Sequence, residues 1–246
     1  MLRTNFDAVA FTHIGGRPVN EDSVCIIRTD ECFAAVLADG LGSHGGGDIA
    51  SASATAAVKN RLPGTGIIHE AVLLDCLETA NKAILAVQKP GVAMKSTAVL
   101  LTIENACAAF AHVGDSRAYH FRNGRVHCQT VDHSVSQLAV LRGEITLAQI
   151  RFHADRNKLL RALGADEQAH GEFTALGPLQ AGDAFLLCTD GFWEYVTDTE
   201  MEIDLIKSET ASEWLSYMLS RIGGRIPNDC DNLSAIAVLY ETVGVR

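Results

Sequence analysis

The stretch Phe33-Ala-Ala-Val-Leu-Ala-Asp39-Gly40 is a short apolar run that ends on a carboxylate. An apolar run of this length, bounded by a turn pair, predicts a buried strand. A charged side chain at the end of a buried strand costs free energy unless its charge is compensated. An ordinary Asp-Gly turn would explain one such site. Repetition of the pattern elsewhere in the chain would favour a functional role for these carboxylates.

Three more aspartates stand at the ends of apolar runs: Asp190 after Phe185–Thr189, Asp115 after Ala108–Val113, and Asp231 before Leu233–Tyr240. Several neighbouring runs are separated by too few residues for a crossover helix, which indicates a mostly antiparallel sheet. Because the end of one antiparallel strand lies beside the start of its neighbour, we expect these acids and Asp39 to meet on one rim. Convergent carboxylate oxygens favour Mg²⁺ or Mn²⁺.

The pattern along the whole chain predicts an α+β fold. Strands are expected over Ser23–Ile27, Cys32–Ala38, Thr97–Ile103, Cys107–Val113, Arg117–Phe121, Arg125–Val131, Asp183–Thr189 and Leu233–Tyr240. Asn123-Gly124 is a strong signal for a two-residue hairpin. Helices are expected over Asp48–Leu62, Ile67–Val87 and Ser212–Ile222. Strands thus run in groups and helices in pairs, which favours helices packed on a sheet over alternating βαβ units.

The composition is that of an ordinary globular protein. The 246 residues carry 20 Lys+Arg against 30 Asp+Glu, and the net charge of −10 argues against binding to nucleic acid or to anionic membranes. The seven cysteines form no C-x-x-C pair, which indicates reduced thiols in a cytoplasmic protein. The chain shows no signal-peptide or bilayer-spanning run, so we expect no membrane insertion. Its length suits one domain over residues 1–246.

A second polar cluster, Arg17-Pro-Val-Asn20-Glu21-Asp22, precedes the first predicted strand. A guanidinium group recognises phosphate through paired hydrogen bonds. Taken alone, the cluster is explained better as a solvated loop.

Taken together, these motifs resemble the metal-dependent protein phosphatases of the PPM (PP2C) family, and above all its compact bacterial members. The matching motifs follow the family's order: Arg17…Asn20-Glu21-Asp22-Ser23, Ala38-Asp39-Gly40-Leu41-Gly42-Ser43-His44, Ser96-Thr97-Ala98, Val113-Gly114-Asp115-Ser116-Arg117, Asp132-His133-Ser134, Arg156-Asn157…Arg161-Ala-Leu-Gly164, Thr189-Asp190-Gly191 and Asp231-Asn232-Leu233-Ser234. No single motif is specific, but the ordered set is.

The resemblance implies a four-layer α-β-β-α sandwich, in which two antiparallel sheets are stacked and a helix pair covers each outer face. It also implies two Mn²⁺ or Mg²⁺ ions, with a third in some relatives, in a cleft at one end of the sandwich. The resemblance implies Asp39 as the carboxylate that bridges both metals and the Gly40 carbonyl as a backbone ligand. It also implies Asp190 and Asp231 as ligands of the first metal, Glu21 and Asp22 as acids that hold the second directly or through water, and Asp115 with Asp190 at the third. Arg17 matches the residue that binds the substrate phosphate.

The implied activity is hydrolysis of phosphoserine and phosphothreonine in proteins, by direct attack of a water or hydroxide that bridges the metals. Asp39, Asp190 and Asp231 are therefore candidate catalytic residues. No cysteine is followed six residues later by arginine, as a thiol-based phosphatase loop requires. The implied partners are phosphorylated proteins and an opposing Ser/Thr kinase, with type VI secretion control as one setting. We expect a monomer.

Some positions depart from the family pattern. Eukaryotic relatives place a histidine, proposed as general acid, where this chain has Leu41. His44 follows in a glycine-rich loop and is the candidate general acid, since histidine titrates near neutral pH, although a plain loop residue explains it equally well. Lys95 stands where a glycine usually precedes Ser-Thr-Ala.

The segment 134–157 is the expected flap beside the cleft and would tune substrate choice, the alternative being an ordinary helical insertion. For Asp132-His133 we expect a structural hydrogen-bonding role.

Two other functions compete with this interpretation. Gly40-Leu-Gly42-Ser-His-Gly45 has the G-x-G-x-x-G spacing of a dinucleotide-binding turn, but the preceding Asp39 would repel a pyrophosphate, and no strand ending in an acid follows about 20 residues later. An inactive scaffold of the same fold is the second alternative. The presence of every expected acid favours an active enzyme over that scaffold.

Overall fold

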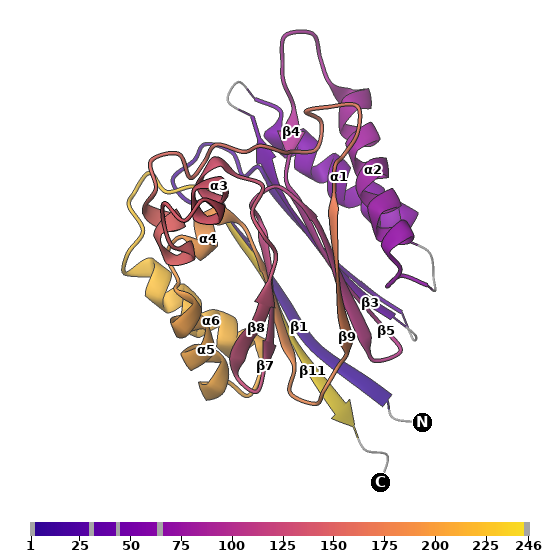
Figure 1. Cartoon of the computed structure of the whole chain (residues 1–246), viewed down its shortest axis with the longest axis vertical. Coiled ribbons are helices and arrows are strands. Elements are labelled where there is room, and N and C mark those ends of the chain that lie inside the picture. The colour runs from indigo at the N-terminus through magenta and orange to yellow at the C-terminus, as the bar shows by residue number, and fades with distance from the viewer. Residues whose placement is uncertain (1–2, 30–31, 43–44, 63–65, 244–246) are drawn as a thin grey trace.

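The computed structural model describes residues 3–29, 32–42, 45–62 and 66–243. Two antiparallel sheets lie face to face, and helices cover the outer side of each sheet (Figure 1). This arrangement confirms the predicted α+β, α-β-β-α sandwich.

Each sheet draws its strands from distant parts of the chain. The first has the order β1-β11-β10-β7-β8, and the second has the order β2-β3-β5-β6-β9 with β4 paired to β3. The strands of the first sheet are β1 (Arg3–His13), β7 (Arg117–Arg122), β8 (Arg125–Gln129), β10 (Ala184–Cys188) and β11 (Leu233–Val243). Those of the second are β2 (Asp22–Arg28), β3 (Cys32–Leu41), β4 (Lys95–Ser96), β5 (Ala98–Glu104), β6 (Cys107–Val113) and β9 (Glu172–Pro178).

The core between the two sheets consists of inward-facing apolar side chains from both of them. Phe110 of β6 and Phe185 of β10 meet edge to face, with ring centroids 6.2 Å apart and planes at 89°. Phe33 and Ile236 belong to the same buried cluster. Because side chains alternate along a strand, the other face of each sheet carries a second apolar set that the helices cover.

Four helices cover the outer faces. α1 (Gly47–Arg61) and α2 (Glu70–Val87) pack on the second sheet, while α5 (Asp198–Lys207) and α6 (Ala211–Gly223) pack on the first. Small buried residues of α1, such as Ala50 and Ala54, recur every four positions and let the helix approach the sheet closely. In α6, the buried Trp214 ring lies 5.1 Å from that of Phe121.

All eight predicted strands and all three predicted helices are present, with ends that differ by a few residues. The Asn123-Gly124 hairpin is confirmed, and both residues have the positive φ, 53° and 73°, that such a turn requires. The sequence interpretation missed β1, β4, β9, the short helix α4 (Asp190–Trp193) and α5. β9 is an edge strand that contains glycine and ends in proline, and β4 has only two residues, so neither carries a clear strand pattern.

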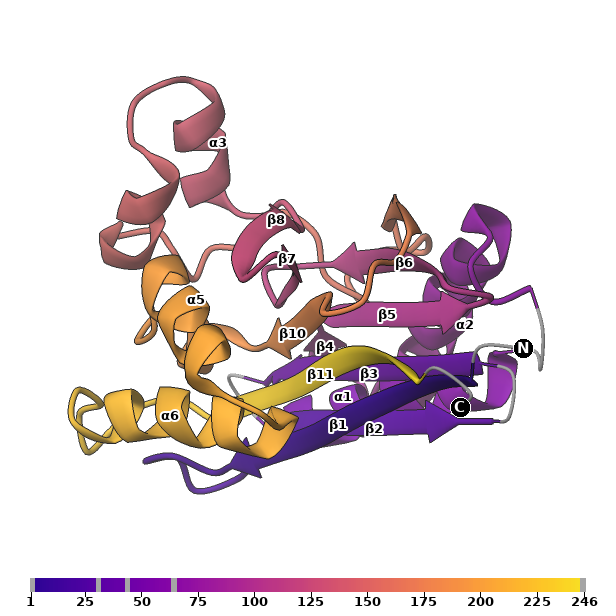
Figure 2. The same ribbon diagram turned by 90° about the horizontal axis from the view of Figure 1, so that it is seen from below.

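The expected flap contains the helix α3 (Val135–Leu141) and the 3₁₀ helix η1 (Leu147–Phe152). A bridge between Ser134 and Leu159 closes its base, and Figure 2 shows α3 standing away from the sheets. β4 and α3 lie toward the end of the sandwich opposite to the start of β1 and the end of β11 (Figure 1). None of the helices in the described residues has the length and apolar character to cross a bilayer.

Candidate metal centre

Five acidic side chains line one cleft with a volume of about 390 Å³: Glu21, Asp39, Asp115, Asp190 and Asp231. The structure thus brings together the four aspartates that the sequence placed at strand ends. They do not share the rim of one sheet, however, because β3 and β6 belong to one sheet whereas β10 and β11 belong to the other. The cleft lies where the ends of the two stacked sheets meet.

The Ser-Thr-Ala motif fixes the backbone of the Asp-Gly motif. The Asp39 N–H donates to Thr97 Oγ1 at 3.0 Å, and its carbonyl accepts from the Thr97 N–H at 2.8 Å and from Ser96 Oγ at 2.9 Å. Gly40 lies against α1, so closely that a Cβ would stand 2.1 Å from the Gly47 carbonyl oxygen. Only glycine can occupy this position.

Glu21 connects the N-terminal loop to the start of α1. Its Oε1 accepts the Gly47 N–H at 3.2 Å, while its own N–H donates to Asn232 Oδ1 at 2.8 Å. The helix N-terminus to which a dinucleotide pyrophosphate would bind is therefore already occupied by a carboxylate of the chain. This contact counts against the dinucleotide alternative.

Asp22 does not line the cleft but stands opposite Asp39, which does, in the β2–β3 register. Its Oδ2 accepts from Thr189 Oγ1 at 3.3 Å, whereas its Oδ1 is buried and has no hydrogen-bond partner among the described residues. A buried carboxylate oxygen without a partner calls for a ligand, because leaving it unsatisfied costs free energy.

Asp190, Asp231 and Arg17 form the side of the cleft that belongs to the first sheet. Asp190 begins the short helix α4 (Asp190–Trp193), and its Oδ1 accepts the Gly191 N–H at 2.6 Å. Asp231 Oδ2 accepts from Arg17 Nη2 at 2.8 Å. The Arg17 side chain is half-exposed and lines the cleft.

Asp115 is almost fully buried at the turn that follows β6. Gly114 has a φ of 103° and packs so closely on Thr97 that a Cβ would lie 2.6 Å from Thr97 Cγ2. The Asp115 carbonyl accepts from Trp193 Nε1 at 3.0 Å, which fixes the turn against α4. Both contacts hold the Asp115 side chain in the cleft wall.

The carboxylates disturb one another's protonation. Burial and the repulsion of neighbouring carboxylates hold the pKa values of Asp39 and Asp115 well above the ordinary range, and raise those of Asp22 and Asp190 to about 7. Such a cluster is unfavourable in its charged form unless a cation is present. Hard, all-oxygen ligation and the unpartnered Asp22 oxygen both fit a divalent ion such as Mn²⁺ or Mg²⁺.

The candidate general acid, His44, lies outside the described residues, so the structure does not test its role. Among the described residues that line the cleft, none is a histidine.

The Asp132 and Arg117 motif residues form a buried ion pair. Arg117 Nε and Nη2 donate to the two Asp132 oxygens at 2.8 and 2.7 Å, and the guanidinium lies 3.6 Å from the centre of the Trp193 ring. This pair links the segment just before the flap to the start of β7, two residues after Asp115. The contact agrees with the structural role expected for Asp132, whereas the matching role of Arg117 was not anticipated.

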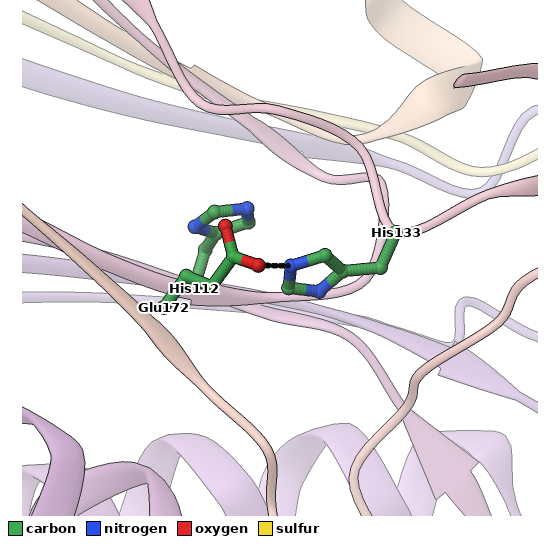
Figure 3. Close-up of side chains that lie close together, drawn as sticks. All are labelled: His112, His133 and Glu172. Atoms are coloured by element: carbon green, nitrogen blue, oxygen red, sulfur yellow. Dashed lines mark ion pairs between the residues drawn. The ribbon is translucent and has the colours of Figure 1, made fainter. Parts of the chain in front are cut away.

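Behind the cleft wall, His112, His133 and Glu172 form a compact cluster (Figure 3). The two imidazole rings are stacked, with centroids 4.6 Å apart and planes at 16°. The lone pairs of imidazole nitrogens lie in the ring plane, so nearly parallel rings at this separation do not point at one metal ion about 2 Å from each nitrogen. Stacking therefore disfavours a metal between them.

The hydrogen bonds of His133 instead indicate a structural role. Its Nδ1 accepts the Gly114 N–H at 3.1 Å, which leaves the proton on Nε2, and that nitrogen lies 3.2 Å from Glu172 Oε1. The His133 N–H donates in turn to the Gly114 carbonyl at 2.9 Å. His133 thus holds both sides of the glycine that precedes Asp115.

Comparison with known proteins gives a consistent result. The family model for protein phosphatase 2C matches residues 11–229. The serine/threonine phosphatase stp of Listeria monocytogenes is 30% identical over 231 residues, which cover 89% of each chain. Among solved structures, the catalytic domain of the phosphatase PstP with two manganese ions superposes with a TM-score of 0.78 at 26% identity, over 97% of this chain and 99% of that one. PppA of Pseudomonas aeruginosa, a regulatory component of type VI secretion, superposes with a TM-score of 0.76 at 28% identity. The match covers 96% of this chain and 97% of PppA.

Proposed function

Because this chain belongs to the protein phosphatase 2C family, we propose that it is a metal-dependent protein phosphatase that hydrolyses phosphoserine and phosphothreonine in proteins. The observation that carries the proposal is the convergence of five acidic side chains from both sheets on one cleft beside an arginine. If each aspartate served only to form a local turn, the acids would have no reason to line the same cavity. The retention of every acid also favours an active enzyme over an inactive scaffold.

The metal ligands are proposed to be Asp39, shared by two ions, and the Gly40 carbonyl, with Asp190 and Asp231 for the first ion. Glu21 and Asp22 would hold the second ion directly or through water, and Asp115 with Asp190 would hold a third. When bound, divalent ions lower the pKa of water and neutralise phosphate charge, which allows hydrolysis without a covalent enzyme intermediate. The relative PstP was solved with two manganese ions, which supports the same class of ion here.

The chain's own residues prepare the substrate for that reaction. Arg17 binds the phosphate, and the 2.8 Å ion pair with Asp231 holds its guanidinium in place beside the carboxylates. The flap, with its base closed by Ser134 and Leu159, stands beside the cleft and contacts the protein substrate. His44 is proposed to protonate the leaving serine or threonine oxygen.

The test measures hydrolysis of p-nitrophenyl phosphate and of phosphoserine, phosphothreonine and phosphotyrosine peptides, with Mn²⁺, with Mg²⁺ and with chelator. We expect turnover with either ion, a preference for phosphoserine and phosphothreonine over phosphotyrosine, and loss of turnover with chelator. Absence of turnover across a range of Mn²⁺ concentration and pH would refute the proposal and favour the scaffold.

The physiological partner proposed for the enzyme is an opposing Ser/Thr kinase. The likeness to PppA, a regulatory component of type VI secretion in Pseudomonas aeruginosa, supports that setting for this chain as well. Deleting the gene should then raise Ser/Thr phosphorylation of secretion components, as phosphoproteomics can measure. Unchanged phosphorylation of those components would remove type VI secretion from the proposal.

A further inference from the structure

Lys95 is a half-buried cation in the same cleft as the five acids. It lies on β4, directly opposite Leu41 in the β3–β4 register. The next residue, Ser96, donates through Oγ to the Asp39 carbonyl at 2.9 Å and through its N–H to the Leu163 carbonyl at 3.0 Å. The backbone that carries Lys95 is therefore fixed against the proposed metal site, while its four-carbon side chain can adjust to a ligand.

The ammonium group of Lys95 forms no ion pair with any residue that the structure describes. Arg17, which also lines the cleft, is by contrast paired with Asp231 at 2.8 Å. A cation that lines a binding cleft without an internal partner is available for an anionic group of the substrate.

The residues that line the cleft and the cavity next to it indicate which group that is. A second cavity, of about 210 Å³, adjoins the cleft and shares Arg17, Asp190 and Asp231 with it, but Lys95 does not line this cavity. Lys95 therefore lines a part of the cleft that the second cavity does not share, as do Leu41 and Ala93. A phosphate bound at Arg17 and the carboxylates would leave Lys95 beside the residues that flank the phosphorylated one.

We propose that Lys95 binds an acidic side chain next to the phosphorylated residue, so that the enzyme prefers phosphoprotein segments with Asp or Glu flanking the phosphoserine or phosphothreonine. This inference rests on the proposed phosphatase function. The protein as a whole carries a net charge of −10 and repels such segments, so a local cation in the cleft is what would admit them. A partly exposed ion pair corresponds to about a fivefold preference.

The experiment compares the Mn²⁺-loaded wild type with Lys95→Gln, Lys95→Glu and the control Lys89→Gln. Lys89 is an exposed lysine in a neighbouring loop that does not line the cleft. The substrates are two phosphothreonine peptides of the same length, one with acidic and one with alanine flanks, and p-nitrophenyl phosphate. For each protein, the readout is the ratio of kcat/KM for the acidic peptide to that for the alanine peptide.

We expect a ratio of about five for the wild type and for Lys89→Gln, about one for Lys95→Gln, and below one for Lys95→Glu, with the change mainly in KM. A wild-type ratio of one, or an unchanged ratio in Lys95→Gln, would overturn the proposal. An equal loss on all three substrates in Lys95→Gln would also overturn it, because it would assign Lys95 to the phosphate itself. Hydrolysis of p-nitrophenyl phosphate by the wild type separates these outcomes from failure of the proposed phosphatase function.

Discussion

Asp22 and Asp39 stand directly opposite each other in the β2–β3 register, although both carry carboxylates. Like charges at paired positions on neighbouring strands destabilise a sheet. Burial adds to this cost, and the Asp22 Oδ1 has no partner among the described residues. The sheet therefore holds a local strain that a divalent cation would relieve.

The first prediction is that Mn²⁺ stabilises the folded protein. With millimolar Mn²⁺ we expect the midpoint of thermal unfolding to rise by about 5–10 °C, because the ion binds only the folded arrangement of carboxylates. Differential scanning calorimetry with Mn²⁺, Ca²⁺ and chelator measures the shift. An equal midpoint with Mn²⁺ and with chelator would contradict the assignment of this cleft as a metal site.

The second prediction concerns the acids that hold the ion. Asp39→Asn and Asp190→Asn should each lower kcat by about a thousandfold or more, because each removes a charged ligand. Both variants should remain folded, and they should be at least as stable as the wild type in chelator, because each removes one of the repelling charges. Circular dichroism and chemical unfolding check the fold, and full activity in either variant would overturn the ligand assignment.

The third prediction separates phosphate binding from metal binding. Arg17→Ala should raise KM for a phosphopeptide by about tenfold or more, because a charge-assisted hydrogen bond to phosphate is lost. Mn²⁺ affinity, measured by calorimetry, should change less than it does in Asp39→Asn. Arg61→Ala is the matched control, since Arg61 forms a half-exposed ion pair with Asp75 and neither residue lines the cleft. An unchanged KM would remove Arg17 from the phosphate site.

Most of the fold and the acidic residues of the site could be predicted from the sequence. The errors in that prediction have physical causes. Asp39 and Asp190 were recognisable because an acid at the end of a buried strand is an unusual pattern. Their origin in two different sheets was not, because strand pairing depends on contacts between residues as distant as His13 and Leu233. The Arg117–Asp132 ion pair was not predicted for the same reason. The two residues are 15 positions apart, and only the folded structure shows that Arg117 is buried and that Asp132 is its partner.

The fourth prediction tests the hydrogen bonds behind the cleft wall. His133→Ala should destabilise the fold by about 1–3 kcal/mol, because the buried Gly114 N–H loses its acceptor. Burial, together with the neighbouring His112, lowers the pKa of His133 to about 4, so the ring accepts this bond as a neutral imidazole at pH 7. Glu172→Gln, which keeps an acceptor for the His133 Nε2–H, should cost less. Equal urea stability of His133→Ala and wild type would contradict the role assigned to the ring.

The fifth prediction uses an ion-pair network remote from the site. Glu200 caps α5 through Thr197 and binds Arg225 Nη1 and Nη2 at 2.8 and 2.6 Å. The Arg225 hydrogen bond is the largest influence that lowers the pKa of Glu200, from 4.5 to about 2. Because the folded pKa lies below the unfolded one, the charged carboxylate stabilises the fold fully above about pH 4.5, and this contribution is lost as the pH falls toward 2.

Glu200→Gln should therefore cost about 1–2 kcal/mol of unfolding free energy at pH 7, and the difference from wild type should shrink steadily between pH 5 and pH 3. Urea unfolding at pH 7, 5, 4 and 3 measures the difference. Glu241→Gln is the control, because Glu241 is exposed and pairs with no cation among the described residues, so its effect should be small at every pH. A Glu200→Gln effect that stayed constant down to pH 3 would show that the network acts through packing and neutral hydrogen bonds instead of through charge.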